Sequence, residues 1–212
     1  MIASVFSKTR PINYLIIGIV SFFLYTLYQF KETNWTNDGW QIVQKTALFF
    51  AVFFSYFLLN FLTFKNNLTK SNNYTILLFS IFLFLFPTIF KAPNVIIANL
   101  LILLALRRLL SLENLKNTKE KIFDASFWIF VAALFHFWCI LFVILVFISI
   151  LFHASSNYKN WIIPFLALFG VAILSVLADL LLDNNLLSDI YSEINISFNF
   201  SYFDNIYQNL AL

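Results

Sequence analysis

Long uninterrupted apolar runs, with the charges gathered in short clusters between them, constrain this chain more than any other feature. Of its 212 residues, 61% are hydrophobic and only 11% are charged, whereas soluble proteins average about 25% charged residues. A soluble domain needs a polar exterior, which this composition cannot supply. Since only helices and closed barrels satisfy their backbone in lipid, the pattern predicts an all-α fold, a polytopic transmembrane helical bundle.

The apolar runs predict about six membrane spans. A hydrocarbon core of about 30 Å needs roughly 20 apolar residues per helix. Pro11 suits the first turn of the first span, and Pro87 is expected to kink or end the third. We expect a bundle over residues 1–182, with spans at residues 12–28, 46–64, 74–90, 95–106, 127–152 and 161–182.

The remaining residues, 183–212, form an acidic tail whose pattern differs from that of the spans. Apolar side chains recur every four residues, as on one face of a helix. The pattern predicts an amphipathic segment that lies on the membrane surface. The recurring residues are Ile190, Ile194, Phe198, Tyr202, Ile206 and Leu210.

Lysine and arginine favour one orientation, because short loops that carry them prefer the cytoplasm. With six single passes and a cytoplasmic N-terminus, nine of these residues lie inside and four outside. We therefore expect a multi-pass protein of the cell inner membrane with a cytoplasmic N-terminus.

Residues 127–152 leave two arrangements open. The segment has 26 residues without Gly or Pro, and a turn of bare backbone in lipid is costly. One long tilted helix is therefore favoured. A hairpin around His136 would instead place the tail outside and change the charge count to ten inside and three outside.

Arg107 and Arg108 end the fourth predicted span. Guanidinium groups grip phosphates with two hydrogen bonds, so the pair could clamp a lipid-linked or nucleotide substrate. Arginines at a membrane surface more often contact anionic lipid headgroups as an anchor. The anchor is the favoured interpretation of the pair.

Three further residues are weak catalytic candidates. His136 lies deep in an apolar run, where an ionisable group suggests a proton relay, although a hydrogen bond to a neighbouring helix is favoured. Asp179 lies near the end of the sixth span, four residues before Asp183, and could serve acid–base chemistry or bind a divalent cation, but carboxylates at a helix end are more often simply interfacial. Asp38 stands in the first outer loop between Trp35 and Trp40, where lipid-sugar glycosyltransferases place a base, but tryptophans there are ordinary interface anchors.

The sequence offers no motif for a cofactor, a metal or a nucleic acid. It has no phosphate-binding glycine loop and no zinc pattern, and Cys139 is its single cysteine. A net charge of +3 is too small and scattered for nucleic-acid binding. Only three glycines occur, which weighs against a transporter, whose broken helices usually need Gly and Pro. Asn60 and Asn99 fall within spans and predict hydrogen bonds between helices.

The opening residues 1–13, MIASVFSKTRPIN, and the segments 106–108, 117–119 and 123–128 carry a family likeness. They resemble an uncharacterised family of multi-pass inner-membrane proteins from Bacteroidetes, particularly flavobacteria. The resemblance implies a location and no reaction. It also implies further spans in longer members, of which this chain would be a shortened one.

These observations favour a non-enzymatic subunit or scaffold of a cell-envelope assembly, and leave open whether the chain is an enzyme. Its expected partners are the lipid bilayer and a membrane protein or a second copy of itself. The alternatives are a membrane enzyme acting on lipid-linked sugars or phosphates and, less favoured, a small-molecule transporter.

Overall fold

The computed structural model describes residues 6, 11–30, 39–69, 72–86, 89–90, 92–155 and 157–182. Within them the predicted all-α class is confirmed, because the regular structure consists of seven α-helices and two short 3-10 helices without a strand. The predicted surface helix at 183–212 and the loop that contains Asp38 lie outside the described residues.

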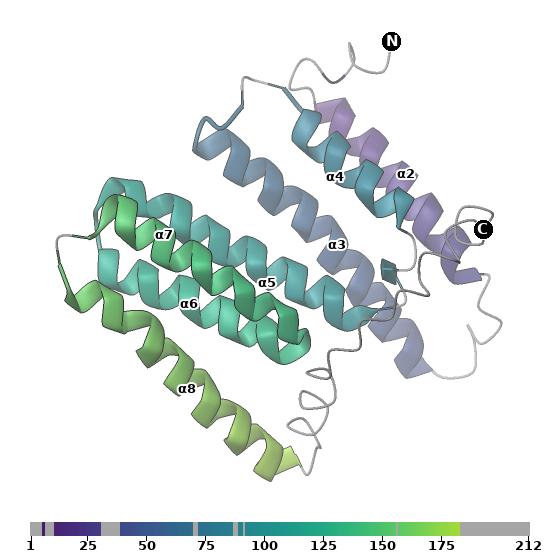
Figure 1. Ribbon diagram of the computed structural model, residues 1–212. Helices are drawn as coiled ribbons and strands as arrows, with labels where there is room; N and C mark the ends of the chain where they lie inside the picture. Colours follow the sequence, from purple (N-terminus) through teal and green to yellow (C-terminus); the bar gives the residue numbers. More distant parts are fainter. Residues whose placement is uncertain are drawn as a thin grey trace, which may run out of the picture.

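The helices form an open array rather than a closed ring (Figure 1). In that view α2 and α4 lie at one edge, α3 and α5 follow, α6 and α7 come next, and α8 forms the other edge. The elements are α2 (Pro11–Phe30), α3 (Gly39–Lys65), α4 (Tyr74–Leu85), α5 (Pro93–Leu110), η2 (Ser111–Asn114), α6 (Thr118–Phe135), η3 (Phe137–Phe142), α7 (Val143–His153) and α8 (Lys159–Leu182).

Three helical segments are long and apolar enough to cross a membrane, which by length and composition is typical of a membrane protein. They are Gly39–Lys65, Pro93–Asn114 and Lys159–Leu181, and three shorter apolar helices accompany them, Ile12–Leu27, Tyr74–Leu85 and Phe137–His153. The number of complete crossings is therefore still a prediction.

Prolines begin and end helices where the sequence indicates. Helix α2 begins at Pro11 and α5 has Pro93 in its first turn, where the missing N–H has no helical partner to lose. Helix α4 ends at Leu85, two residues before Pro87, because the residue that precedes a proline is displaced from helical geometry. Phe86 accordingly has φ −121° and ψ 65°.

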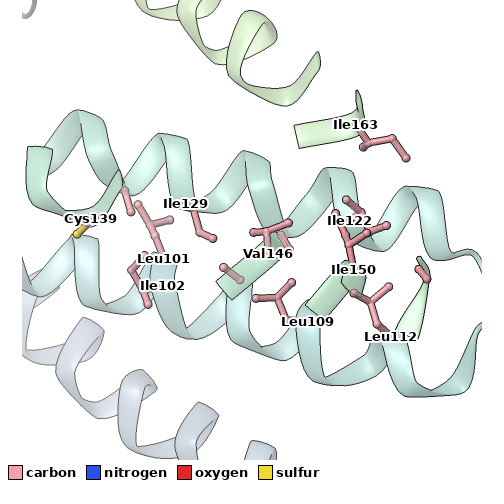
Figure 2. Packing of buried hydrophobic residues seen from close by; sticks show 14 of the residues in the cluster. Leu101, Ile102, Leu109, Leu112, Ile122, Ile129, Cys139, Val146, Ile150 and Ile163 are labelled. Atoms are coloured by element: carbon pink, nitrogen blue, oxygen red, sulfur yellow. The ribbon is translucent and has the colours of Figure 1, made fainter. Parts of the chain in front are cut away.

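The expectation of one tilted helix over residues 127–152 is wrong. Helix α6 ends at Phe135, His136 is extended with φ −148° and ψ 106°, and α7 then runs back along α6. Figure 2 shows the reversal, because Cys139 lies beside Leu101 at one end while Ile150 lies near Ile122 at the other. The hairpin alternative is the one that the structure adopts.

The hairpin turns without glycine because its backbone groups remain bonded. His136 N donates to Ala132 O at 2.9 Å, and Cys139 N donates to His136 O at 3.0 Å. The 3-10 helix η3 then continues into α7. The turn therefore avoids the unpaired backbone in lipid that favoured a single helix.

Helices α5 and α6 form the most tightly buried contact of the bundle. Their buried residues alternate in steps of three and four, which is the spacing of a coiled-coil seam. Alanines within both seams allow the two backbones to approach closely. The seam residues are Ala98, Ile102, Ala105 and Leu109 on α5, Leu112 on η2, and Ile122, Ala125, Ile129 and Ala132 on α6.

Aromatic rings and hydrogen bonds join α2, α3 and α4. Tyr56 of α3 packs edge-on against Phe79 of α4, with the ring centroids 5.2 Å apart. The Tyr14 hydroxyl donates to Asn60 Oδ1 at 2.7 Å and lies 3.2 Å from Asn73 Oδ1. The predicted interhelical hydrogen bond of Asn60 is thus confirmed.

Candidate functional site

Of the lysines and arginines in the described residues, all but Lys45 gather at one end of the bundle, which we call the basic end. It is the end where α3 and α5 finish and where α6 and α8 begin. The Lys121 Nζ donates to the backbone oxygen of Ser111, which ties α6 to the end of α5. The basic end holds Lys65, Arg107, Arg108, Lys116, Lys119, Lys121 and Lys159.

Arg108 is neutralised within the chain. Its guanidinium Nη2 lies 3.0 Å from Asp124 Oδ2, and the two side chains are 46% and 37% exposed. An ion pair this open to solvent contributes about 1 kcal/mol or less to stability. The pair therefore joins α5 to α6 weakly, and it leaves Arg108 less available to an external anion.

Arg107 has a different environment from its neighbour. Its guanidinium lies over the Phe61 ring, with Arg107 Cζ 5.1 Å from the ring centroid. Lys65 Nζ lies 5.2 Å from the centroid of the same ring. Two cations from two helices thus meet around one aromatic side chain, and each such contact is worth roughly 0.5–1 kcal/mol at an exposed site.

The sequence analysis missed Lys65 and Phe61 as members of this cluster. Phe61 and Lys65 are four residues apart on α3, so they share one helix face. The sequence could therefore have predicted that Phe61 and Lys65 lie together. It could not have predicted that Arg107 of α5 lies beside them, because that contact depends on the register between the two helices.

His136 lies at the tip of the hairpin, far along the bundle from the basic end. It is half-buried and caps α6, and its backbone accepts from Cys139 N. His136 makes an interaction within the chain. Trp138, two residues away, is 44% exposed. The structure therefore does not bring His136 near Arg107 and Arg108.

Asp179 also lies away from the arginines. Helix α8 starts beside the end of α7, where Asn160 Nδ2 donates to Ala154 O at 2.9 Å. It then runs along α6, so that Val171 packs with Phe130, and Asp179 follows two turns later. A site that combines Asp179 with the arginine pair is excluded by this direction.

A small apolar cavity lies between α3, α4 and α5. Its volume is about 170 Å³, and Ser55 and Asn99 are its polar lining residues. Ser55 Oγ donates to Ala51 O at 2.9 Å. The Asn99 side chain makes no hydrogen bond to another described residue, so the predicted interhelical bond of Asn99 is not found among them. Sites for small organic molecules occupy about 300–1,000 Å³, so this cavity is small for a substrate.

The described residues contain no cluster of three or more His, Cys, Asp or Glu side chains that could hold a metal ion. Cys139 is buried among apolar residues of α5, α6 and α7.

No protein-family model, curated protein or solved structure matches this chain. The resemblance to Bacteroidetes inner-membrane proteins stays a prediction.

Proposed function

We propose that this chain is a non-enzymatic integral membrane subunit or scaffold of a cell-envelope assembly. The observation that carries the proposal is the separation of the candidate catalytic residues, His136 and Asp179, from each other and from the arginine pair. Arg108 is bound to Asp124 at the basic end, while His136 stands at the hairpin tip and Asp179 near the far end of α8. Acid–base catalysis needs its groups within hydrogen-bond reach of one reacting centre.

The open array of helices also supports a role in an assembly. Helix α8 packs against α6 and α7 through one face. The opposite face carries large apolar side chains, among them Leu166 and Phe169, which are 59% and 65% exposed. Such a face suits lipid or the apolar helix of another membrane protein.

Location in the cell inner membrane with a cytoplasmic N-terminus belongs to the same proposal. The gathering of cations at the basic end supports it, since cytoplasmic loops carry the excess of Lys and Arg. The basic end would then face the cytoplasm, and the hairpin tip would lie within the membrane.

The alternatives make different demands on the structure. An enzyme for lipid-linked sugars or phosphates would need an acid beside Lys65 and Arg107, and neither cation has a carboxylate partner among the described residues. A transporter would need a substrate-sized cavity, and the cavity beside Asn99 has about 170 Å³. The scaffold role fits these observations better than either alternative.

The test asks whether the chain forms a complex and whether that complex persists when the candidate catalytic side chains are replaced. The tagged chain is extracted from its native membranes in polymer-bounded lipid discs, and its stoichiometry is measured by native mass spectrometry. We expect a complex of fixed composition that the His136→Ala and Asp179→Asn variants retain. A chain that is monomeric in the discs, and that by itself turns over a lipid-linked substrate in an Asp179-dependent manner, would contradict the proposal.

A further inference from the structure

We propose that Lys65 and Arg107 form a binding site for a phosphate group, supplied by an anionic lipid headgroup at the basic end. The site consists of these two cations and the Phe61 ring between α3 and α5. It requires only that the helices cross a membrane, so it is independent of the scaffold role.

Unpaired positive charge is the first reason for the assignment. Neither Lys65 nor Arg107 has a carboxylate partner among the described residues, although Arg108, the next residue along the chain, is paired with Asp124. Both free side chains are exposed. Like charges gathered around one ring repel each other, and an anion that contacts both relieves that repulsion.

The depth of the site in the membrane identifies the anion. Helix α3 has 27 residues, which at 1.5 Å per residue gives a length of about 40 Å. The hydrocarbon core takes about 30 Å and the headgroup regions bring the total to about 40–45 Å. The last turn of α3, with Lys65, therefore reaches the level of the phosphates.

The ring and the helices beneath it hold the cations in place. Leu58 and Leu62 of α3 are buried against Leu103 of α5 directly below the site, which fixes the register of the two helices. Phe61 then limits the freedom of both side chains by cation–π contact. A guanidinium held in this way can give a phosphate two parallel hydrogen bonds, while the ammonium adds a point charge.

The experiment titrates the detergent-solubilised full chain with phosphatidylglycerol, with phosphatidylcholine or with inorganic phosphate at constant ionic strength, and follows the thermal midpoint. A ligand that binds the folded state raises this midpoint. A rise with phosphatidylglycerol alone assigns the site to a lipid headgroup. A rise with inorganic phosphate as well assigns it to the phosphate group from either source.

Variants separate a defined site from a diffuse basic surface. We expect Arg107→Gln and Lys65→Gln to raise the half-saturating concentration about tenfold each, and the matched control Lys116→Gln to change it about twofold or less. Arg107→Lys should also weaken binding, because the two-pronged geometry is lost. Phe61→Leu keeps both charges and tests whether the cation–π contacts with the aromatic ring contribute to binding.

Two results would overturn the site. On a diffuse surface each cation contributes about equally, so Lys116→Gln would weaken binding about fivefold, as Arg107→Gln does. A midpoint that responds to neither phosphatidylglycerol nor inorganic phosphate would equally reject it. Because midpoints without ligand are recorded for every variant, a folding defect is distinguished from a loss of binding.

Discussion

Alanine provides the closest helix contact in this bundle, where many membrane proteins use glycine. Ala105 on α5 and Ala125 and Ala132 on α6 are essentially inaccessible. Between membrane helices there is little hydrophobic driving force, so the stability of the pair depends on close packing and hydrogen bonds. The low glycine content of the chain is therefore compatible with a tight bundle.

Enlarging a seam alanine should destabilise the protein. We expect Ala132→Leu to lower the free energy of unfolding by about 1–3 kcal/mol, because the added side chain has no space between α5 and α6. Ala133→Leu is the matched control, since Ala133 lies on the same helix and is partly exposed. Unfolding in mixed micelles, followed by circular dichroism, measures both. Equal losses in the two variants would mean that the seam is not the tightest contact.

At the scale of elements, the α6–η3–α7 hairpin is the feature with the largest consequence. It returns the chain to the basic end, so the residues before α6 and after α7 lie at the same end of the bundle. A single crossing would have placed them at opposite ends. The difference decides where α8 starts and, with it, where Asp179 lies.

Cysteine labelling tests the hairpin without any assumption about orientation. In a Cys139→Ala background, Lys116→Cys and Ser155→Cys each place a thiol at an exposed position on either side of the hairpin. We expect an impermeant maleimide to label both variants from the same side of sealed vesicles, because α7 runs back along α6. Labelling from opposite sides would establish a single crossing instead.

At the scale of the whole molecule, the hairpin strengthens the charge bias across the membrane. On the proposed crossings, the hairpin would move Lys159 to the side of the arginine pair, and the count over the sequence would be ten cations against three, compared with nine against four for six plain passes. The positive-inside rule then favours a cytoplasmic basic end more clearly. The proposed orientation would then place the end of α8 outside.

Labelling in whole cells tests this orientation. We expect Leu181→Cys, which is 82% exposed at the end of α8, to react with the impermeant maleimide in intact spheroplasts. Ser155→Cys should react only after lysis. Trp40→Cys, at the start of α3, serves as a second outer position. Protection of Leu181→Cys until lysis would reverse the proposed orientation or add a crossing.

The sequence identified the two arginines of the candidate site, but it did not identify the residues that they contact. Arg107 and Arg108 were recognisable as a basic helix end, and both indeed lie at the basic end. Arg107 contacts the Phe61 ring, whereas Arg108 pairs with Asp124. This difference depends on how α5 is rotated against α3 and α6. No local pattern in α5 encodes that rotation.

The sequence alone determined the class of this protein, because composition and apolar runs dictate helices in lipid and prolines mark where helices begin and end. It could not determine which helix faces meet or whether residues 127–152 turn back. In a membrane both the packed face and the lipid-exposed face are apolar, so hydrophobic periodicity no longer identifies the contact. Those features follow from the fit of small side chains and the satisfaction of backbone groups, which depend on the neighbouring helices.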